Sequence, residues 1–430
     1  MIQMQLVKAD GKAEYALLEQ LAARSGEVDR QVTAAVTEII DTVRREGDAA
    51  VREYTRRFDG VDAPLRRISR QELAEMAAGC EETVYAALQR AADNIRDFHQ
   101  RQVQQSWLTT KEDGTILGQR IRGLSRVGVY VPGGTAAYPS SVLMNAIPAR
   151  IAGVEEIVMV TPPPKNGDFN ADVMAAAYIA GVDAVYLCGG AQAVAALAYG
   201  TETIPKVDKI VGPGNIFVAT AKRLTYGQVD IDMIAGPSEI LVLADDTAEP
   251  AYLAADLMSQ AEHDRLASAI LLTPSEDIAR RTLEELDKQI AALSRQDIIR
   301  ASLETYGAVI VCRDMDEAVA FANRLAPEHL EVMCDNPMEY VGRLDNAGSV
   351  FLGKYSPEPL GDYFAGPNHV LPTSGTARIF SPLSVDSFLK KSSFIYYNRA
   401  ALTAAREDIT AIARAEGLDA HAHSIDVRFE

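Results

Sequence analysis

A pattern of apolar strand, turn and helix recurs in the middle of the chain and constrains the fold more than any other feature. Four apolar runs each lead to glycine or proline and then to an alanine-rich segment: residues 127–131, 157–160, 184–187 and 207–211. The first run ends in a glycine loop at residues 133–134, and an Ala-Gly-Val triplet precedes the second and third runs. Strands that alternate with helices at this spacing predict a parallel α/β sheet.

The same alternation resumes after a crossing segment at residues 231–238. It predicts a second α/β unit with strands at residues 239–243, 269–272, 308–312 and 349–352. Helices are expected between these strands, at residues 250–263, 275–293 and 315–325. Residues 12–106 have the apolar spacing of helices instead. His99 stands alone in a polar helix of this part, so we expect it at the surface.

The C-terminal part combines a long loop with a helix. Residues 366–384 are rich in glycine, proline and serine. A loop of this length without secondary structure of its own is often functional. The residues at 399–415 predict a final helix, which ends before Gly417.

Composition excludes several classes of function. The 430 residues are 48% hydrophobic and 24% charged, as in a soluble globular protein, and 42 basic against 60 acidic residues give a net charge of −18. This charge argues against a nucleic-acid or anionic-membrane partner. No apolar run reaches the roughly 18 residues of a membrane helix, and we expect no signal peptide. The four cysteines are far apart, so we expect them reduced in a cytoplasmic protein.

A carboxylate and an imidazole stand side by side where one predicted helix ends. Pro327 cannot continue the helix over residues 315–325, and the apolar alternation that follows predicts a short strand. Neighbouring strand residues point to opposite faces, so Glu328 and His329 share one site only if the backbone is irregular at this junction. The simpler interpretation is a helix exit with two solvated polar residues.

Five of the six histidines lie in the C-terminal part of the chain: His263, His329, His369, His421 and His423. Gln260 and His263 share a helix face, although a core histidine with a hydrogen-bonded glutamine would also explain them. Asp362 is expected in a loop, as an Asx turn or as a metal ligand. His421 follows the final helix, where a solvated tail is the simpler interpretation. Histidine together with carboxylate or amide oxygen is a donor set that suits zinc.

Two glycine loops, at residues 188–192 and 212–215, follow predicted strands and precede predicted helices. Phosphate groups bind at such places because the free N–H groups of a helix start point toward them. Neither loop has the G-x-G-x-x-G spacing of dinucleotide-binding turns. The loops therefore allow a nucleotide site, and tight strand-to-helix turns explain them as well.

Six motifs together resemble the histidinol dehydrogenase family, and the resemblance covers nearly the whole chain. The motifs lie at residues 212–215, 232–239, 260–263, 326–330, 366–373 and 416–421. The resemblance implies an α/β fold with two incomplete Rossmann-like parallel-sheet domains and helical N-terminal and C-terminal extensions. It implies an NAD-dependent four-electron oxidation of L-histidinol to L-histidine through the aldehyde. It also implies one zinc ion per active site, which positions the substrate, and a homodimer that exchanges C-terminal segments.

The resemblance also implies roles for individual residues. Two are catalytic: His329 takes the hydroxyl proton, with a pKa expected near the working pH, and Glu328 activates water on the aldehyde carbon. The expected zinc ligands are Gln260, His263, Asp362 and His421. The expected substrate contacts are Ser238, Gln260, His263, His329, Asp362, Glu416 and His421. The expected NAD contacts are Tyr130, Gln192 and Asn215.

Four parts of the chain are expected on this basis. An N-terminal helical arm covers residues 1–25. Residues 26–128 and 237–380 form a larger α/β domain that carries the zinc and catalytic residues. Residues 129–236 form an α/β domain that binds NAD, and residues 381–430 form a C-terminal helical tail that is exchanged between subunits.

Three other functions stay open at this point. The same fold with zinc and NAD could oxidise another small alcohol. An aldehyde dehydrogenase with a cysteine nucleophile would use Cys188 beside the glycine loop, although Cys188 ends an apolar strand and has no base adjacent in sequence. A zinc-containing binding protein would reduce no NAD with any amino alcohol.

Overall fold

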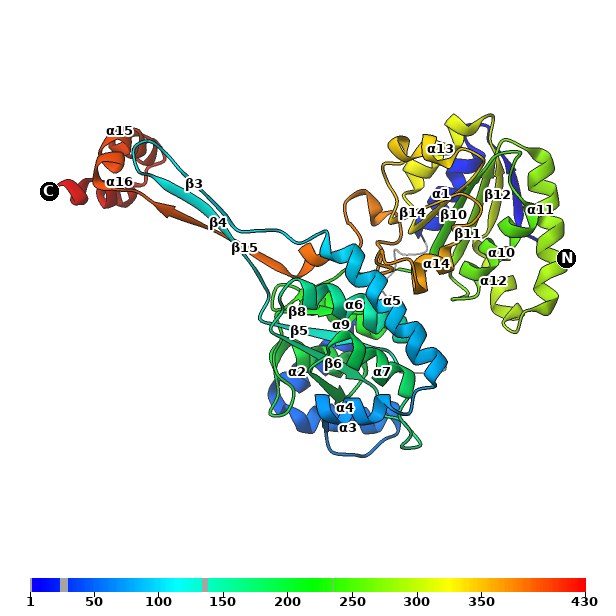
Figure 1. The fold of residues 1–430 in the computed structure, drawn as a ribbon, viewed down its shortest axis with the longest axis horizontal. Coiled ribbons are helices and arrows are strands. Elements are labelled where there is room, and N and C mark those ends of the chain that lie inside the picture. Colours follow the sequence, from blue (N-terminus) through cyan, green and yellow to red (C-terminus); the bar gives the residue numbers. More distant parts are fainter. Residues whose placement is uncertain (1, 24–29, 134–137, 235) are drawn as a thin grey trace. The chain divides into compact units, whose positions relative to one another are not determined.

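Two six-stranded sheets organise the described residues of this computed structural model (Figure 1). The structure describes residues 2–23, 30–133, 138–234 and 236–430. Gly134 of the first glycine loop, Ala235 of the motif at 232–239 and the expected boundary at residues 25–26 lie outside the described residues. The contacts define two units: Met1–Gln102 with Leu124–Phe388, and Val103–Gly123 with Leu389–Glu430.

The first sheet belongs to the first unit and is parallel throughout its described strands. In spatial order the strands are β1 (Gln5–Lys8), β12 (Ala308–Val311), β11 (Ser268–Thr273), β10 (Glu239–Ala244), β13 (His329–Met333) and β14 (Ser349–Leu352). The chain leads outward from β10 through β11 to β12 on one side and from β13 to β14 on the other. The strand order therefore reverses between β10 and β13, the kind of place where α/β sheets bind ligands.

Helices cover both faces of this sheet because its strands carry apolar side chains on both faces. Alternate residues of β10 enter different cores: Ile240 and Val242 one, Leu241 and Leu243 the other. The first core is completed by α10 (Pro250–Ala261), α11 (Glu276–Gln289) and α12 (Gln296–Tyr306). The second is completed by α1 (Ala13–Ala23) and α13 (Met315–Leu325).

The second sheet, also in the first unit, has the same reversal. In spatial order its strands are β2 (Arg67–Ser69), β7 (Ala184–Leu187), β6 (Glu156–Thr161), β5 (Arg126–Tyr130), β8 (Lys209–Val211) and β9 (Asp230–Ile231). The short β2 pairs antiparallel with β7, and the other pairings between these strands are parallel. The order reverses between β5 and β8.

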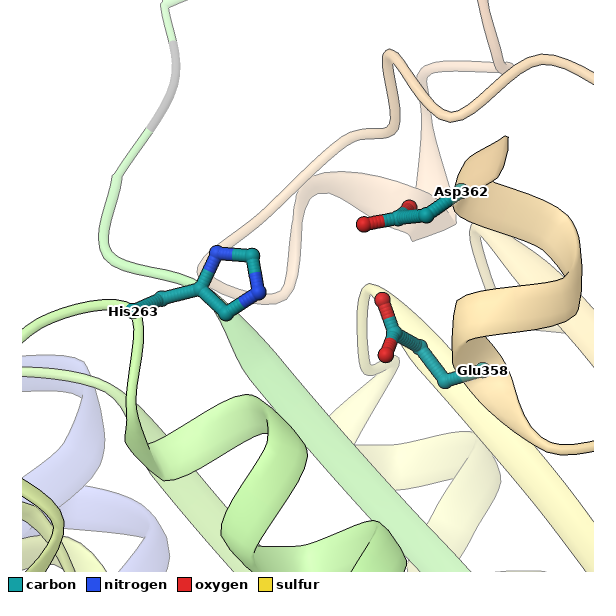
Figure 2. Close-up of side chains that lie close together, drawn as sticks. All are labelled: His263, Glu358 and Asp362. Atoms are coloured by element: carbon teal, nitrogen blue, oxygen red, sulfur yellow. The ribbon is translucent and has the colours of Figure 1, made fainter. Parts of the chain in front are cut away.

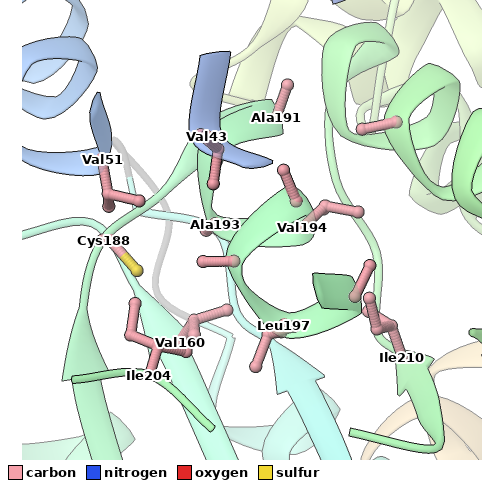
Figure 3. Close-up of a cluster of buried hydrophobic side chains, with 14 of the residues drawn as sticks. Val43, Val51, Val160, Cys188, Ala191, Ala193, Val194, Leu197, Ile204 and Ile210 are labelled. Carbon is pink, nitrogen blue, oxygen red and sulfur yellow. The ribbon is translucent and has the colours of Figure 1, made fainter. Parts of the chain in front are cut away.

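Apolar helices also surround the second sheet. Figure 3 shows part of one core, which α2 (Arg30–Glu46), α3 (Asp48–Asp59), α8 (Gly190–Tyr199) and α9 (Ile216–Thr225) share with the strands. Four further helices pack against one another: α4 (Arg70–Ala77), α5 (Glu82–Gln100), α6 (Pro139–Ile151) and α7 (Ala171–Ala180). Of these, α6 contacts β5 and β6.

These sheets confirm the predicted fold class. Two local expectations differ from the structure. Residues 5–8 form strand β1 within the expected helical arm. Helices α2 and α3 share a core with the second sheet, whereas the expected domains group residues 26–128 with 237–380. The division into domains stays a prediction.

The expectation that His99 lies at the surface is wrong. The His99 side chain is fully buried, with Nδ1 2.8 Å from Gln102 Oε1 and Nε2 3.4 Å from the Asn368 amide. The spacing contained the signal, because Leu88, Ala92 and Ile95 form one buried stripe of α5 that His99 continues.

The second unit joins two segments that are far apart in sequence. An antiparallel sheet contains, in spatial order, β15 (Leu389–Tyr396), β4 (Ile116–Gly123) and β3 (Trp107–Thr110). Helices α15 (Arg399–Ala415) and α16 (Asp419–Asp426) follow, and α15 has the predicted bounds. Strand β15 occupies part of the expected helical tail at 381–430. Across the described residues, no helix has the length and apolar character that a membrane crossing requires.

Candidate active site

The candidate catalytic residues lie where the strand order of the first sheet reverses, at the amino ends of its strands. His329 opens β13 and pairs with Ile240 near the start of β10. Ligands of open α/β sheets usually bind at the carboxyl ends of strands. Here the segments that lead into β10, β11 and β13 carry Ser238, His263 and Glu328 instead.

The backbone is irregular at this junction, as the proline predicts. Ala326 ends α13 in the left-handed conformation, with φ 53°, and its N–H donates to the Ala322 carbonyl. The turn brings both candidate side chains to the backbone of Glu239. Glu328 Oε2 accepts from the Glu239 N–H at 2.9 Å, and His329 Nδ1 lies 3.0 Å from the Glu239 carbonyl oxygen. One residue of β10 thus orients both groups.

The hydrogen bond between His329 Nδ1 and the Glu239 carbonyl oxygen sets the tautomer of His329. A carbonyl oxygen only accepts, so Nδ1 carries the proton and the neutral ring keeps a free lone pair on Nε2. Nε2 is buried, has no hydrogen-bond partner among the described residues, and lies 3.8 Å from Glu358 Oε1. Burial lowers the pKa of His329 to about 4, below the value near the working pH that we expected. The imidazole is therefore neutral at pH 7.

Glu328 is also buried, so the interpretation as two solvated polar residues is wrong. Glu328 is 8% exposed and His329 is 4% exposed. Burial raises the pKa of Glu328 well above its usual range, and the carboxylates of Glu239, Asp362 and Glu358 add to this effect. A carboxylate in this setting has a strong affinity for a proton.

Three potential metal ligands converge beside these residues. One ligand atom from each of His263, Glu358 and Asp362 lies within 4.8 Å of the other two. Figure 2 shows both carboxylates directed from one helix toward the imidazole of His263. That helix is α14 (Glu358–Tyr363), so the expectation that Asp362 lies in a loop is wrong. Glu358 is not among the residues expected from the sequence, although it lies one helical turn before Asp362 and so shares its helix face.

Gln260 supplies the test of whether a metal fits. The residue is 1% exposed, and neither atom of its side-chain amide has a hydrogen-bond partner within the described part of the chain. Burying an unpaired amide costs about 2–7 kcal/mol, so such a group indicates a ligand. His263, three residues later, is exposed, which contradicts the interpretation as a bonded core pair. Amide oxygen, imidazole and carboxylate together fit zinc.

The other expected contacts are distributed over both units. Ser238 is half-buried directly before β10, in the first unit. Glu416 caps α15 and His421 lies in α16, both exposed and both in the second unit. The place of these two residues relative to His263, Glu358 and Asp362 stays a prediction.

His369, for which the sequence implies no role, also lies at this site. Its Nδ1 lies 3.0 Å from the Asp362 carbonyl oxygen and its Nε2 3.4 Å from Ser141 Oγ. A cavity of about 200 Å³ is lined by His329, Asp362 and His369 with neighbouring residues. These contacts hold the C-terminal end of α14 in place.

The expected NAD contacts lie at the carboxyl ends of strands in the second sheet, around the point between β5 and β8 where its strand order reverses. Tyr130 ends β5, and its hydroxyl accepts from the Gly190 N–H at 3.0 Å. Gln192 is buried, and its amide atoms lack a partner among the residues that the structure describes. Asn215 caps α9 by accepting from the N–H groups of Phe217 and Val218. An unpaired buried amide beside a glycine turn fits a nucleotide.

Cys188 does not fit the role of a nucleophile. Its side chain is fully buried in the core of the second sheet (Figure 3). Burial raises the pKa of the thiol far above its usual range, so the reactive thiolate is absent at neutral pH. This argues against the cysteine-dependent aldehyde dehydrogenase.

Comparisons with known proteins agree with the resemblance. Residues 22–429 match the family model described as histidinol dehydrogenase. The histidinol dehydrogenase of Geobacillus kaustophilus is 58% identical over 396 residues, which are 92% of this chain and 93% of that protein. The histidinol dehydrogenase of Clostridium acetobutylicum is 54% identical over 412 residues, 96% of each protein.

A solved structure gives the same result. The crystal structure of histidinol dehydrogenase from Elizabethkingia anophelis matches with a TM-score of 0.93 and 38% identity, and the match covers 100% of this chain and 98% of that one. The resemblance seen in the motifs is therefore confirmed. This chain is an oxidoreductase of histidine biosynthesis and belongs to the histidinol dehydrogenase family, which uses NAD and zinc.

Proposed function

We propose that this chain oxidises L-histidinol to L-histidine through the aldehyde and reduces two NAD per substrate. The observation that carries the proposal is the setting of His329. Its Nδ1 is tied to the Glu239 carbonyl, while its Nε2 is buried and unpaired among the described side chains, 3.8 Å from Glu358. A neutral imidazole held in this way accepts a proton from a bound alcohol.

In the first step, Nε2 of His329 takes the hydroxyl proton of histidinol. The carbinol carbon gives a hydride to NAD⁺, and its C–O bond becomes the carbonyl of the aldehyde. The products are histidinal, NADH and one proton on His329. The hydrogen bond to Glu239 keeps the ring in one orientation, so no reorientation is needed when the proton arrives.

In the second step, Glu328 takes a proton from water as the water oxygen attacks the aldehyde carbon. The hydrated aldehyde then gives a second hydride to a second NAD⁺, and the carboxylate of histidine forms with release of the remaining protons. The Glu239 N–H fixes one oxygen of Glu328. Its raised pKa makes the ionised carboxylate of Glu328 a strong base, which suits it to this task.

We assign the zinc to Gln260, His263, Asp362 and, from the C-terminal segment, His421. The support is the unpaired buried amide of Gln260 and the convergence of His263 with two carboxylates. Glu358 is a further oxygen donor at this place. Bound zinc supplies a positive anchor for the imidazole and amine of the substrate, which leaves the hydroxyl for His329. Ser238 and Glu416 are assigned as additional substrate contacts.

We assign the nicotinamide cofactor to Tyr130, Gln192 and Asn215, around the reversal point of the second sheet. All four cysteines are free, in line with a reducing compartment, so we infer that the reaction takes place in the cytoplasm. Histidinol and NAD are the expected small-molecule partners, and neither nucleic acid nor membrane is part of the proposal.

We infer a homodimer in which the C-terminal segment of one chain completes the site of the other. The second unit supports this inference because its thin sheet exposes large apolar side chains, with Ile395 73% and Trp107 54% exposed. Exposed apolar groups gathered on a small unit are typical of an interface. Exchange of a segment between identical subunits is an accessible way to cover them.

Subunit complementation tests the exchange. His263→Asn and His421→Asn subunits are each expected to be inactive as homodimers, whereas a mixed dimer has one site with both lesions and one with neither. Random reassortment makes half of the dimers mixed, so activity should return to about a quarter of wild type. The measurement is activity after joint unfolding and refolding, with separately refolded mutants as the control. Mixed dimers, detected by a mass tag, that stay inactive would mean that His421 acts within its own chain.

The direct test of the proposed function is the absorbance of NADH formed from a known amount of L-histidinol. We expect two NADH per substrate. One NADH per substrate would mean that the aldehyde escapes and that Glu328 has no part in a second oxidation. No NADH with histidinol, but some with another amino alcohol, would favour a different substrate on the same fold. No NADH with any amino alcohol would favour the zinc-containing binding protein.

A further inference from the structure

A buried ion pair lies beneath the second glycine loop and has no part in the chemistry described so far. Lys222 lies in α9, and Asp232 follows β9. Their side chains are only 6% and 2% exposed, and Lys222 Nζ is in direct contact with Asp232 Oδ1. Removing two charges from water is costly, and apolar side chains of similar size would fill the same space at least as well. The pair therefore needs an explanation other than packing.

Both members of the pair bind the backbone of one residue, Gly212. Asp232 Oδ2 accepts from the Gly212 N–H at 2.8 Å, and Lys222 Nζ donates to the Gly212 carbonyl at 3.0 Å. Asp232 Oδ1 also accepts from the Met233 N–H at 2.7 Å. The peptide groups on both sides of Gly212 are thus held by charged hydrogen bonds, which are stronger than neutral ones.

The conformation held in this way is one that only glycine adopts easily. Gly212 has φ +111°, and a Cβ atom there would lie 2.1 Å from the carbonyl oxygen of Tyr130. The loop is therefore pressed against the end of β5, at the reversal point of the sheet. Three residues later Asn215 caps α9, where its side-chain oxygen accepts from the N–H groups of Phe217 and Val218. Lys222 belongs to the same helix, so the pair connects α9 to its own entry loop.

We infer that Lys222 and Asp232 are positioning residues for the dinucleotide. They act through Gly212, because they fix the loop at 212–215 so that its N–H groups and the start of α9 are ready for the pyrophosphate before it binds. This inference rests on the proposed placement of NAD at the second sheet. It assigns no contact between the ion pair and the cofactor, since both side chains are buried beneath the loop.

The test uses the zinc-loaded full-length enzyme with the double substitution Lys222→Met and Asp232→Asn. Removing both charges avoids leaving one buried charge alone. The asparagine introduced at position 232 keeps an acceptor for the Gly212 N–H, but the donor to the Gly212 carbonyl is lost. We expect the KM for NAD, and the Kd for NADH measured by its fluorescence, to rise about 10-fold or more, the size of a lost charged hydrogen bond. The KM for histidinol and the zinc content should stay unchanged.

The chain offers a matched control in a neighbouring ion pair. Lys209 and Asp230 pair at 2.8 Å between β8 and β9, with Lys209 buried. Among the described side chains, the hydrogen bonds to the Gly212 backbone come from Lys222 and Asp232 and not from this pair. The double substitution Lys209→Met and Asp230→Asn should lower thermal stability without changing the affinity for NADH. An equal loss of NADH affinity in this control would overturn the inference, because general loosening of the sheet would then explain both results.

A third variant, Asn215→Ala, separates the inference from the proposed cofactor site. It should raise the KM for NAD and leave zinc in place. If Asn215→Ala raises this KM but the Lys222/Asp232 double variant does not, the positioning role is wrong and the cofactor site stands. If neither variant changes it, NAD binds elsewhere and both ideas fail. Should the double variant not fold, Lys222→Gln with Asp232→Asn takes its place, because it also leaves no buried charge and replaces the charged hydrogen bonds to Gly212 with weaker neutral ones. The expected rise is then about threefold, and an unchanged KM would overturn the inference.

Discussion

Turnover of this enzyme should cease when a strong chelator removes its metal, and it should return when zinc is added. The physical reason lies in the potential metal ligands of the first unit. The Gln260 amide is buried without a partner among the described residues, and His263, Glu358 and Asp362 converge on one point. Without a cation, the site has no group that can anchor the imidazole and amine of the substrate. The carboxylates of Glu358 and Asp362 then repel each other, and the Gln260 amide stays without a hydrogen-bond partner.

Substitution of one ligand makes the expectation specific. His263→Asn should lower the zinc content and the activity together, because an imidazole nitrogen is replaced by a shorter amide. Metal content per subunit, measured on the purified protein, is compared with kcat. His423→Asn is the matched control, since His423 is an exposed histidine of α16 outside the proposed ligand set. Full metal occupancy and wild-type activity in His263→Asn would refute the assignment.

Glu328→Gln should separate the two half-reactions. The amide oxygen of glutamine can still accept the Glu239 N–H, so the junction that holds His329 is expected to persist. Glutamine cannot take a proton from water, however, and loss of a general base costs about 10²-fold or more. Oxidation of histidinal should therefore fall by at least this factor, while oxidation of histidinol to the aldehyde falls much less.

The measurement supplies histidinal directly and compares its rate with the first turnover of histidinol. Glu331→Gln is a matched control on β13, the strand that Glu328 directly precedes, because Glu331 is a buried carboxylate that accepts from the Glu358 N–H at 2.7 Å. Any loss in that variant should be equal in both half-reactions, since Glu331 supports the site as a whole. Equal losses in Glu328→Gln would mean that Glu328 only orients His329.

Much of the fold could be predicted from the sequence because its signals are local. The strands β7 and β14 and the helices α13 and α15 have the predicted bounds. When an apolar run of four or five residues between glycines is followed by an alanine-rich helix, a parallel sheet is one of the few structures that buries the apolar side chains of both. The break at Pro327 is equally local, because proline ends a helix whatever surrounds it.

Contacts between distant segments could not be predicted in this way. Strand β15 pairs with β4 across more than half of the chain, and an exposed strand has no buried apolar pattern that reveals its partner. Helices α2 and α3 carry clear apolar stripes, but a stripe does not say which of two sheets it will cover. The burial of His99 depends on the loop at Asn368, which reaches it from the other end of the sequence.

By itself, then, the sequence determined the two parallel α/β sheets, the proline break beside Glu328 and His329, and the motifs of the family. Only the tertiary structure decided the chemistry of those residues. The pKa of His329 is lowered by burial and its tautomer is set by the Glu239 carbonyl, both of which depend on packing from other strands. Glu358 reaches His263 because α14 packs against α10, which directly precedes His263, and proximity of this kind arises only when the chain is folded.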